Sequence, residues 1–201
     1  MLRNVLSRIK WGLMVFGVLM LVFGIYECVM AHKTPFDLNR IPDSEIKPGI
    51  LLEGDVYGNY GAYEEYYNTR YGIKDKSSTL WYYIIPVGEE SFMGVSVNAN
   101  KRGAEFDRQS DETYDYLTGA TDKAPTPLHV KGKVAKMDSE DLGLYKTALR
   151  EIGFSESEID QYALPYYIGS NSFDSWLVLL IVGVVILAIG VVLIFVTRRR
   201  V

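Results

Sequence analysis

The sequence contains a single cysteine, Cys28, among its 201 residues. One cysteine excludes an intramolecular disulfide and any metal site built on several cysteines. The chain also lacks an Asn-X-Ser/Thr sequon, a nucleophile elbow, a P-loop and a dinucleotide-binding fingerprint. Its two histidines, His32 and His129, stand in no zinc-binding pattern. The sequence therefore predicts no metal and no cofactor, and it contains no motif that supports an enzyme.

Charge is scarce in two long stretches. Residues 11–30 read WGLMVFGVLMLVFGIYECVM, where Glu27 is the first charge, and residues 176–197 read WLVLLIVGVVILAIGVVLIFVT, with no charge at all. A helix needs about 20 apolar residues to cross the hydrocarbon layer of a bilayer. Within lipid the backbone must satisfy its own hydrogen bonds, which favours helices. We therefore predict transmembrane helices over 11–30 and 176–197.

Positive residues flank both stretches on their terminal sides. Arg3, Arg8 and Lys10 precede the first, and 198–200 are three arginines that follow the second. Because positive residues next to a span stay in the cytoplasm, residues 1–10 and 198–201 are predicted to be cytoplasmic, in a multi-pass protein of a plasma membrane. The alternative for the first stretch is a cleaved secretory signal, since small residues precede His32. Either way, the segment between the stretches lies outside the cell.

That segment is acidic. Six of the 21 basic residues flank the stretches and one of the 25 acidic residues is Glu27, which leaves 15 basic against 24 acidic residues and a net charge of about −9. Such a charge disfavours nucleic acid and anionic lipid headgroups as partners. The expected partners are the lipid bilayer and a membrane protein or a second copy of the chain.

The segment also has the pattern of a small α+β domain. Residues 31–49, rich in proline, are predicted to be a linker, and 50–170 the extracytoplasmic domain. Strands are expected at 50–57, 128–137 and 165–169, with a hairpin formed by 79–87 and 91–98. Helices are expected at 105–119, at 140–153 after a Ser139 cap, and after Ser155. The prediction is a small, mostly antiparallel sheet, curling toward a barrel, with helices, held between two transmembrane helices.

Tyrosine is concentrated in the stretch DVYGNYGAYEEYYNTRYG, residues 55–72. Three roles are open for these rings: packing against the sheet, which we favour, a binding surface, or contact with lipid headgroups. The residues that would form the binding surface are Tyr60, Tyr63, Tyr66, Tyr67 and Tyr71.

Two functional hypotheses follow. The first is a non-catalytic binding or assembly module, such as a subunit of a larger membrane complex. The alternative is a cell-envelope enzyme that uses carboxylates such as Glu64, Glu65 or Asp111. A close carboxylate pair in a cleft, with one raised pKa, would favour the enzyme.

Glycines repeat at the same interval in both apolar stretches. Gly17 and Gly24 are seven residues apart in the first, as are Gly183 and Gly190 in the second. Seven residues make about two helical turns, so each pair lies on one stripe. Since helices in lipid approach closely through small residues, we predict that the stripes pack together, with Gly17 near the level of Gly190 and Gly24 near Gly183. Alternatively, each stripe faces another protein.

Three segments carry a resemblance to a known family: LLEGDVYGNYGAYEEYY, YYIIPVGEESFMGVSVN and LHVKGKVAKMDSED. Placed between two apolar stretches, they resemble an uncharacterised family of two-span membrane proteins from Gram-positive anaerobic bacteria. The resemblance covers most of the outer domain. It implies this architecture and an envelope location, and it implies no activity for any residue.

Overall fold

The computed structural model describes residues 2–70, 73–75, 78–169 and 175–198. They belong to two units, one made of both ends of the chain (1–33 and 172–201) and one made of residues 34–171. Tyr71, Arg199 and Arg200, which the sequence analysis singled out, lie outside the described residues.

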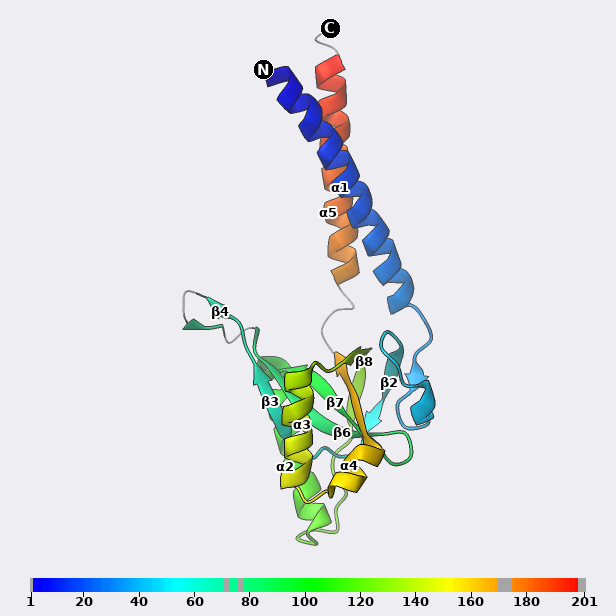
Figure 1. Cartoon of the computed structure of the whole chain (residues 1–201), viewed down its shortest axis with the longest axis vertical. Helices are drawn as coiled ribbons and strands as arrows, with labels where there is room; N and C mark the ends of the chain where they lie inside the picture. Colours follow the sequence, from blue (N-terminus) through cyan, green and yellow to red (C-terminus); the bar gives the residue numbers. More distant parts are fainter. Residues whose placement is uncertain (1, 71–72, 76–77, 170–174, 199–201) are drawn as a thin grey trace. The chain divides into compact units, whose positions relative to one another are not determined.

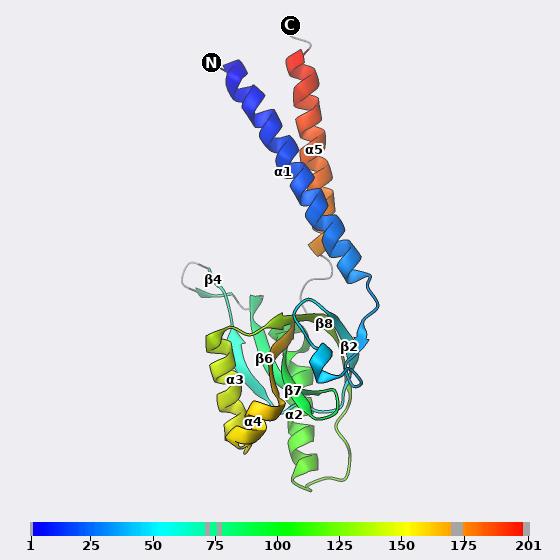
Figure 2. The same ribbon diagram turned by 45° about the vertical axis from the view of Figure 1, so that its right-hand side comes forward.

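The terminal unit consists of two helices, α1 (Leu2–Ala31) and α5 (Ser175–Arg198), which lie side by side in both views (Figures 1 and 2). The mean hydropathy is 2.1 over Lys10–Val29 and 3.5 over Trp176–Val196. Both helices are long and apolar enough to cross a membrane.

The predicted glycine stripes lie at the contact between α1 and α5. A Cβ atom added to Gly17 would come within 2.8 Å of Leu187 Cγ, and one added to Gly24 within 2.9 Å of Leu180 Cδ2. On α5, a Cβ at Gly183 would lie 2.9 Å from Leu21 Cδ2. Each glycine therefore leaves the space that a bulky side chain of the other helix fills.

The prediction of which α5 residue lies at the level of each α1 glycine is wrong by three residues. Gly17 faces Leu187 rather than Gly190, and Gly190 faces Met14. A glycine opposite a glycine would leave a void between the helices, whereas a glycine opposite leucine or methionine is filled. Large and small residues thus alternate along the seam on both helices.

This packing predicts that a side chain at Gly17 separates the helices while one at Gly12 does not. A Cβ at Gly17 would also lie 3.1 Å from the backbone nitrogen of Leu187, whereas a Cβ at Gly12 has nothing within 4 Å. With Cys28 replaced by alanine, cysteines at Leu21 and Gly183 should form a disulfide within one chain. Gly17→Val should slow this crosslinking at least severalfold, and Gly12→Val should leave it unchanged. Crosslinks found only between chains would contradict the packing.

The second unit is built on a mixed sheet (Figure 1). Its strands lie in the order β1 (Phe36–Asp37), β2 (Leu51–Val56), β8 (Leu128–Lys136), β9 (Ala163–Gly169), β7 (Ser91–Asn98), β6 (Leu80–Val87) and β3 (Ala62–Tyr66). Neighbours are antiparallel except β1–β2 and β7–β9. Strands β4 (Thr69–Arg70) and β5 (Ile73–Lys74) form a separate pair. The predicted α+β class with a mostly antiparallel sheet is confirmed.

Two of the helices of this unit begin after a side chain that caps their N-terminus. A 3-10 turn, η1, spans Asp43–Glu45, and a π-helical turn, η3 (Ala99–Gly103), leads into α2 (Ala104–Leu117). Helix α3 (Ser139–Glu151) is capped by Asp138 rather than by Ser139 as predicted, because the Asp138 side chain accepts hydrogen bonds from two backbone amides of the first turn. Ser155 and Glu158 form a capping box at α4 (Glu156–Tyr162), in agreement with the predicted cap.

The two faces of the sheet are covered by different helices. On β6, Tyr83 and Ile85 belong to a core that includes Phe106 of α2. The intervening Ile84 belongs to a second core with Tyr145 and other residues of α3 and α4. Because successive strand residues point to opposite faces, α2 lies on one face and α3 and α4 on the other (Figure 2).

The residues predicted to be a linker, 31–49, are instead largely part of this unit, which begins at Thr34. Leu38, Ile41 and Ile46 are buried and contribute to the core on the α2 face. The proline-rich segment has no helical or strand period, so its burial was not visible in the sequence.

Candidate functional site

The tyrosines of the 55–72 stretch are divided between the core and the surface. Tyr60 and Tyr63 pack against the core on the α3 face, whereas Tyr66 and Tyr67 are 51% and 45% exposed. A bulge in β3 between Ala62 and Glu64 interrupts the regular pairing with β6. The structure therefore does not gather the described tyrosines into one surface. Tyr60 lines a cavity of about 540 Å³, and Tyr63 lines another of about 390 Å³.

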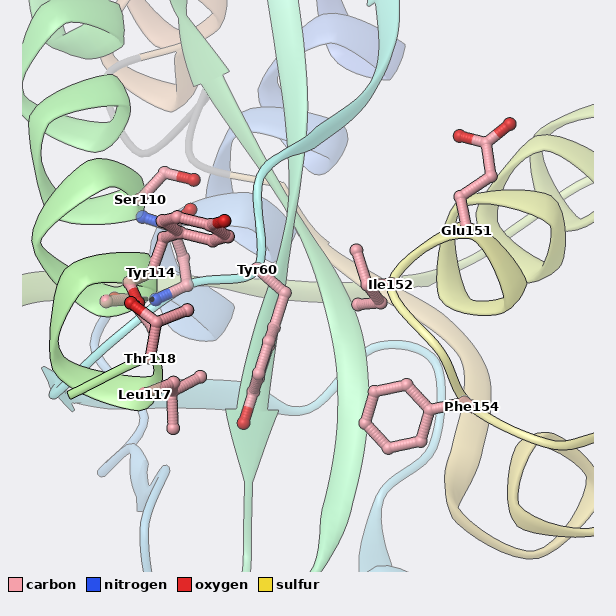
Figure 3. Close-up of a pocket in the computed structure, with 10 residues that line it drawn as sticks. Tyr60, Ser110, Tyr114, Leu117, Thr118, Glu151, Ile152 and Phe154 are labelled. Atoms are coloured by element: carbon pink, nitrogen blue, oxygen red, sulfur yellow. Dashed lines mark hydrogen bonds between the residues drawn. The ribbon is translucent and has the colours of Figure 1, made fainter. Parts of the chain in front are cut away.

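One cavity, the α2–α3 groove, has a volume of about 540 Å³. It is lined by residues 59–60, by one face of α2 and by Glu151, Ile152 and Phe154 (Figure 3). Figure 3 shows Tyr60 between the α2 side chains and those of Ile152 and Phe154. The Tyr60 and Phe154 ring centroids are 6.2 Å apart. Tyr114 and Leu117 of α2 are 69% and 63% exposed. The groove thus presents apolar surface to solvent.

The floor of the groove is a buried hydrogen-bond network centred on Asn59. The side-chain nitrogen of Asn59, Nδ2, donates to the Phe106 carbonyl (2.9 Å) and to Gln109 Oε1 (3.0 Å). The Asn59 backbone donates to Thr113 Oγ1 (3.2 Å), whose own hydroxyl donates to the Gln109 carbonyl (2.7 Å). These polar groups are already satisfied, so the floor offers a ligand little further hydrogen bonding.

Two glycines allow the segment before β3 to occupy this position. A Cβ at Gly58 would lie 3.1 Å from Thr113 Oγ1, so glycine permits the close approach to α2. Gly61 has a φ of 97°, which other residues rarely adopt. Between them, Tyr60 donates its backbone N–H to the carbonyl of Ile84. The segment is therefore fixed to β6, and the Tyr60 ring faces Phe92 and Phe154.

This groove was not predicted from the sequence. Asp111 of the predicted 105–119 helix was singled out as a possible catalytic carboxylate, but the groove uses another face, where Ser110, Tyr114 and Leu117 follow one another at helical spacing. That spacing was a signal available in the sequence. The role of Asn59 was not visible in the sequence, because its hydrogen-bond partners on α2 lie 47–54 residues away along the chain.

A carboxyl pair lies elsewhere, between β3 and α3. Burial and the negative charge of Asp141 raise the pKa of Glu64 to about 7. Glu64 Oε2 is a buried atom without a hydrogen-bond partner, as are the hydroxyls of Tyr63 and Tyr145 nearby on the same core. The ring centroids of these two tyrosines are 5.4 Å apart. The pair can therefore hold one proton near neutral pH.

The other carboxylates considered for an enzyme do not join this pair. Glu65 accepts a hydrogen bond from the indole of Trp81 (3.0 Å), which packs against the core on the α2 face. Asp111 is exposed on α2. A smaller cavity of about 390 Å³ beside β3 is lined by Glu64, Glu65 and Asp107, among others.

His129 belongs to a row of cross-strand charges on β2 and β8. Its ring nitrogens lie 3.0 Å from Asp55 and 3.3 Å from Glu53, and Lys131 Nζ lies 2.8 Å from Glu53. The hydrogen bond from Lys131 is the main cause that lowers the pKa of Glu53. Within the described part of the chain, no group of three or more His, Cys, Asp or Glu side chains is arranged to hold a metal ion.

The fold and these sites define the chain as an α+β domain, carried between two apolar helices that pack on each other. Residues 2–198 match the DUF8577 family, a domain of unknown function, and the chain belongs to this family. This agrees with the resemblance to an uncharacterised family. No curated protein and no solved structure is significantly similar to it.

The Glu64–Asp141 pair predicts that stability falls as pH rises through about 7. The pKa of Glu64 is raised above its unfolded value of 4.5, so the stabilising proton is bound at low pH and lost as pH passes the folded value. The melting temperature of the chain should therefore be lower at pH 8 than at pH 5.5. Glu64→Gln, which keeps a neutral side chain, should remove much of this difference, as measured by thermal unfolding.

Glu65→Gln is the matched control, since it changes the neighbouring carboxylate and keeps an oxygen acceptor for Trp81. It should leave the pH dependence unchanged. Equal pH dependence in the original chain and in Glu64→Gln would contradict proton uptake at this pair.

Proposed function

We propose that this protein is an integral membrane protein with both termini in the cytoplasm, which presents residues 34–171 outside a bacterial plasma membrane as a non-catalytic binding or assembly module. The observation that carries the binding role is the α2–α3 groove, where Tyr114, Leu117 and Ile152 expose apolar surface on an otherwise acidic unit. Exposed apolar patches lined by aromatic side chains are typical of interaction sites.

The membrane role is supported by what α1 and α5 leave uncovered. Their glycines and the leucines opposite them face each other, while bulky apolar side chains such as Phe16, Phe23 and Phe195 are more than half exposed. Water would make this surface costly, whereas lipid tails accept it without a penalty. The arginines at both ends support cytoplasmic termini.

A second candidate is a cell-envelope enzyme that uses carboxylates of the outer domain. The observation in its favour is the Glu64–Asp141 pair, because a carboxyl with a pKa near 7 suits general acid catalysis. Against it, burial and the charge of Asp141 account for the raised pKa of Glu64, and the cavity that Glu64 lines, about 390 Å³, is smaller than the α2–α3 groove. We therefore favour the binding module.

Topology is tested by cysteine labelling in intact cells. With Cys28 replaced by alanine, a membrane-impermeant maleimide should label a cysteine at Lys123, which is exposed in the loop after α2. A cysteine at Ser7 should react only after the membrane is opened. Labelling of Ser7 from outside would contradict the proposed orientation.

The binding role is tested by a photo-crosslinking amino acid placed in the groove. Benzoylphenylalanine at Leu117 should give one adduct of defined mass in intact membranes. The same residue at Leu144, which is 43% exposed on α3 and does not line the groove, should give none. Adducts at neither position, or equal adducts at both positions, would contradict the groove as the binding site.

A further inference from the structure

The residues that line the α2–α3 groove also indicate which chemical groups its partner presents. The walls supply rings and aliphatic side chains, and the polar floor is satisfied internally by Asn59, Gln109 and Thr113. A strongly polar ligand would lose its own hydration there without gaining hydrogen bonds in return. The centre of the groove therefore suits an apolar or aromatic group.

The border of the groove has the opposite character. Glu151 lines the α3 side, and in Figure 3 its carboxylate points away from the rings of Tyr60 and Phe154. On α2, Asp111 follows Ser110 and Asp115 follows Tyr114, and both carboxylates are exposed. Glu151 thus lines the groove on the α3 side, and exposed carboxylates of α2 adjoin the lining residues in sequence.

The basic residues of α2 and α3 are paired with carboxylates. Arg108 pairs with Glu112 at 3.7 Å, Lys146 with Asp160 at 2.8 Å, and Arg150 with Glu156. Among the residues that the structure describes, no ion pair involves Asp111, Asp115 or Glu151. The charge around the groove is therefore negative, which disfavours a second copy of this acidic unit by like-charge repulsion.

We propose that the α2–α3 groove binds a peptide segment of a partner protein in which an apolar side chain is flanked by lysine or arginine. The apolar side chain lies against Tyr60 and Leu117, and the basic side chains lie beside Glu151 on one border and Asp111 and Asp115 on the other. This inference rests on the proposed binding function of the groove and adds the chemistry of the occupant.

The test uses the full chain in phosphatidylcholine nanodiscs and three labelled hexapeptides. The first has phenylalanine and leucine between two pairs of lysines, the second replaces the lysines by glutamates, and the third replaces the apolar residues by serines. Binding is followed by fluorescence anisotropy, with empty nanodiscs as the blank. Only the first peptide should bind, and its affinity should fall as salt is raised, because added ions screen exposed charges.

Variants locate the binding to the groove. Leu117→Ser should lower the affinity for the first peptide about fivefold or more, as expected for the loss of an apolar anchor. Glu151→Gln should weaken it less and reduce the salt dependence. Leu144→Ser and Glu90→Gln, which change exposed residues away from the groove, should have no effect. Because Leu117 is 63% exposed, its variant should keep the melting temperature of the original chain.

The outcomes separate this inference from the proposed function. Equal binding of the glutamate peptide, or equal weakening by the control variants, would overturn the basic-peptide proposal. A photo-adduct at Leu117 without binding of the lysine peptide would keep the binding module and refute this partner chemistry. An adduct with twice the mass of the chain would identify a second copy as the occupant. The absence of both adduct and peptide binding would refute both.

Discussion

The buried side chain of Asn59 joins the segment before β3 to α2, and the geometry of the groove depends on it. It bonds to the carbonyl of Phe106 and to Gln109, which in turn bonds to the carbonyls of Val56 and Thr126. A buried amide that lost these partners would carry a large desolvation cost, so the arrangement is strongly fixed. The groove is therefore a preformed feature of the fold, which lowers the cost of ordering it when a partner binds.

The helix pair follows a different physical rule. In lipid, apolar burial gives no preference for contact between helices, so close packing has to come from shape. Glycines on each helix receive leucine or methionine side chains of the other, and the alternation fixes the antiparallel register of α1 and α5. A shift of one residue along either helix would move these side chains away from the glycines that accommodate them.

The acid pair illustrates how one irregularity changes the chemistry of a strand. In a regular strand, Tyr63 and Glu64 would point to opposite faces. The bulge between Ala62 and Glu64 is accompanied by Tyr63 in the α3 core and by Glu64 next to Asp141. Local backbone geometry, rather than residue type, thus makes Glu64 the carboxyl with the raised pKa, while Glu65 bonds to Trp81.

The sequence alone determined the α+β class, the β6–β7 hairpin, the alternating strand β8 and the two apolar helices, because each rests on local periodicity and turn residues. It also placed the four glycines on stripes, but their register was decided by which bulky residue fills each gap. The burial of Leu38 and Ile41, the roles of Asn59 and Glu64, and the groove itself were decided only by tertiary structure. They depend on contacts between residues far apart in the chain, which no local pattern records.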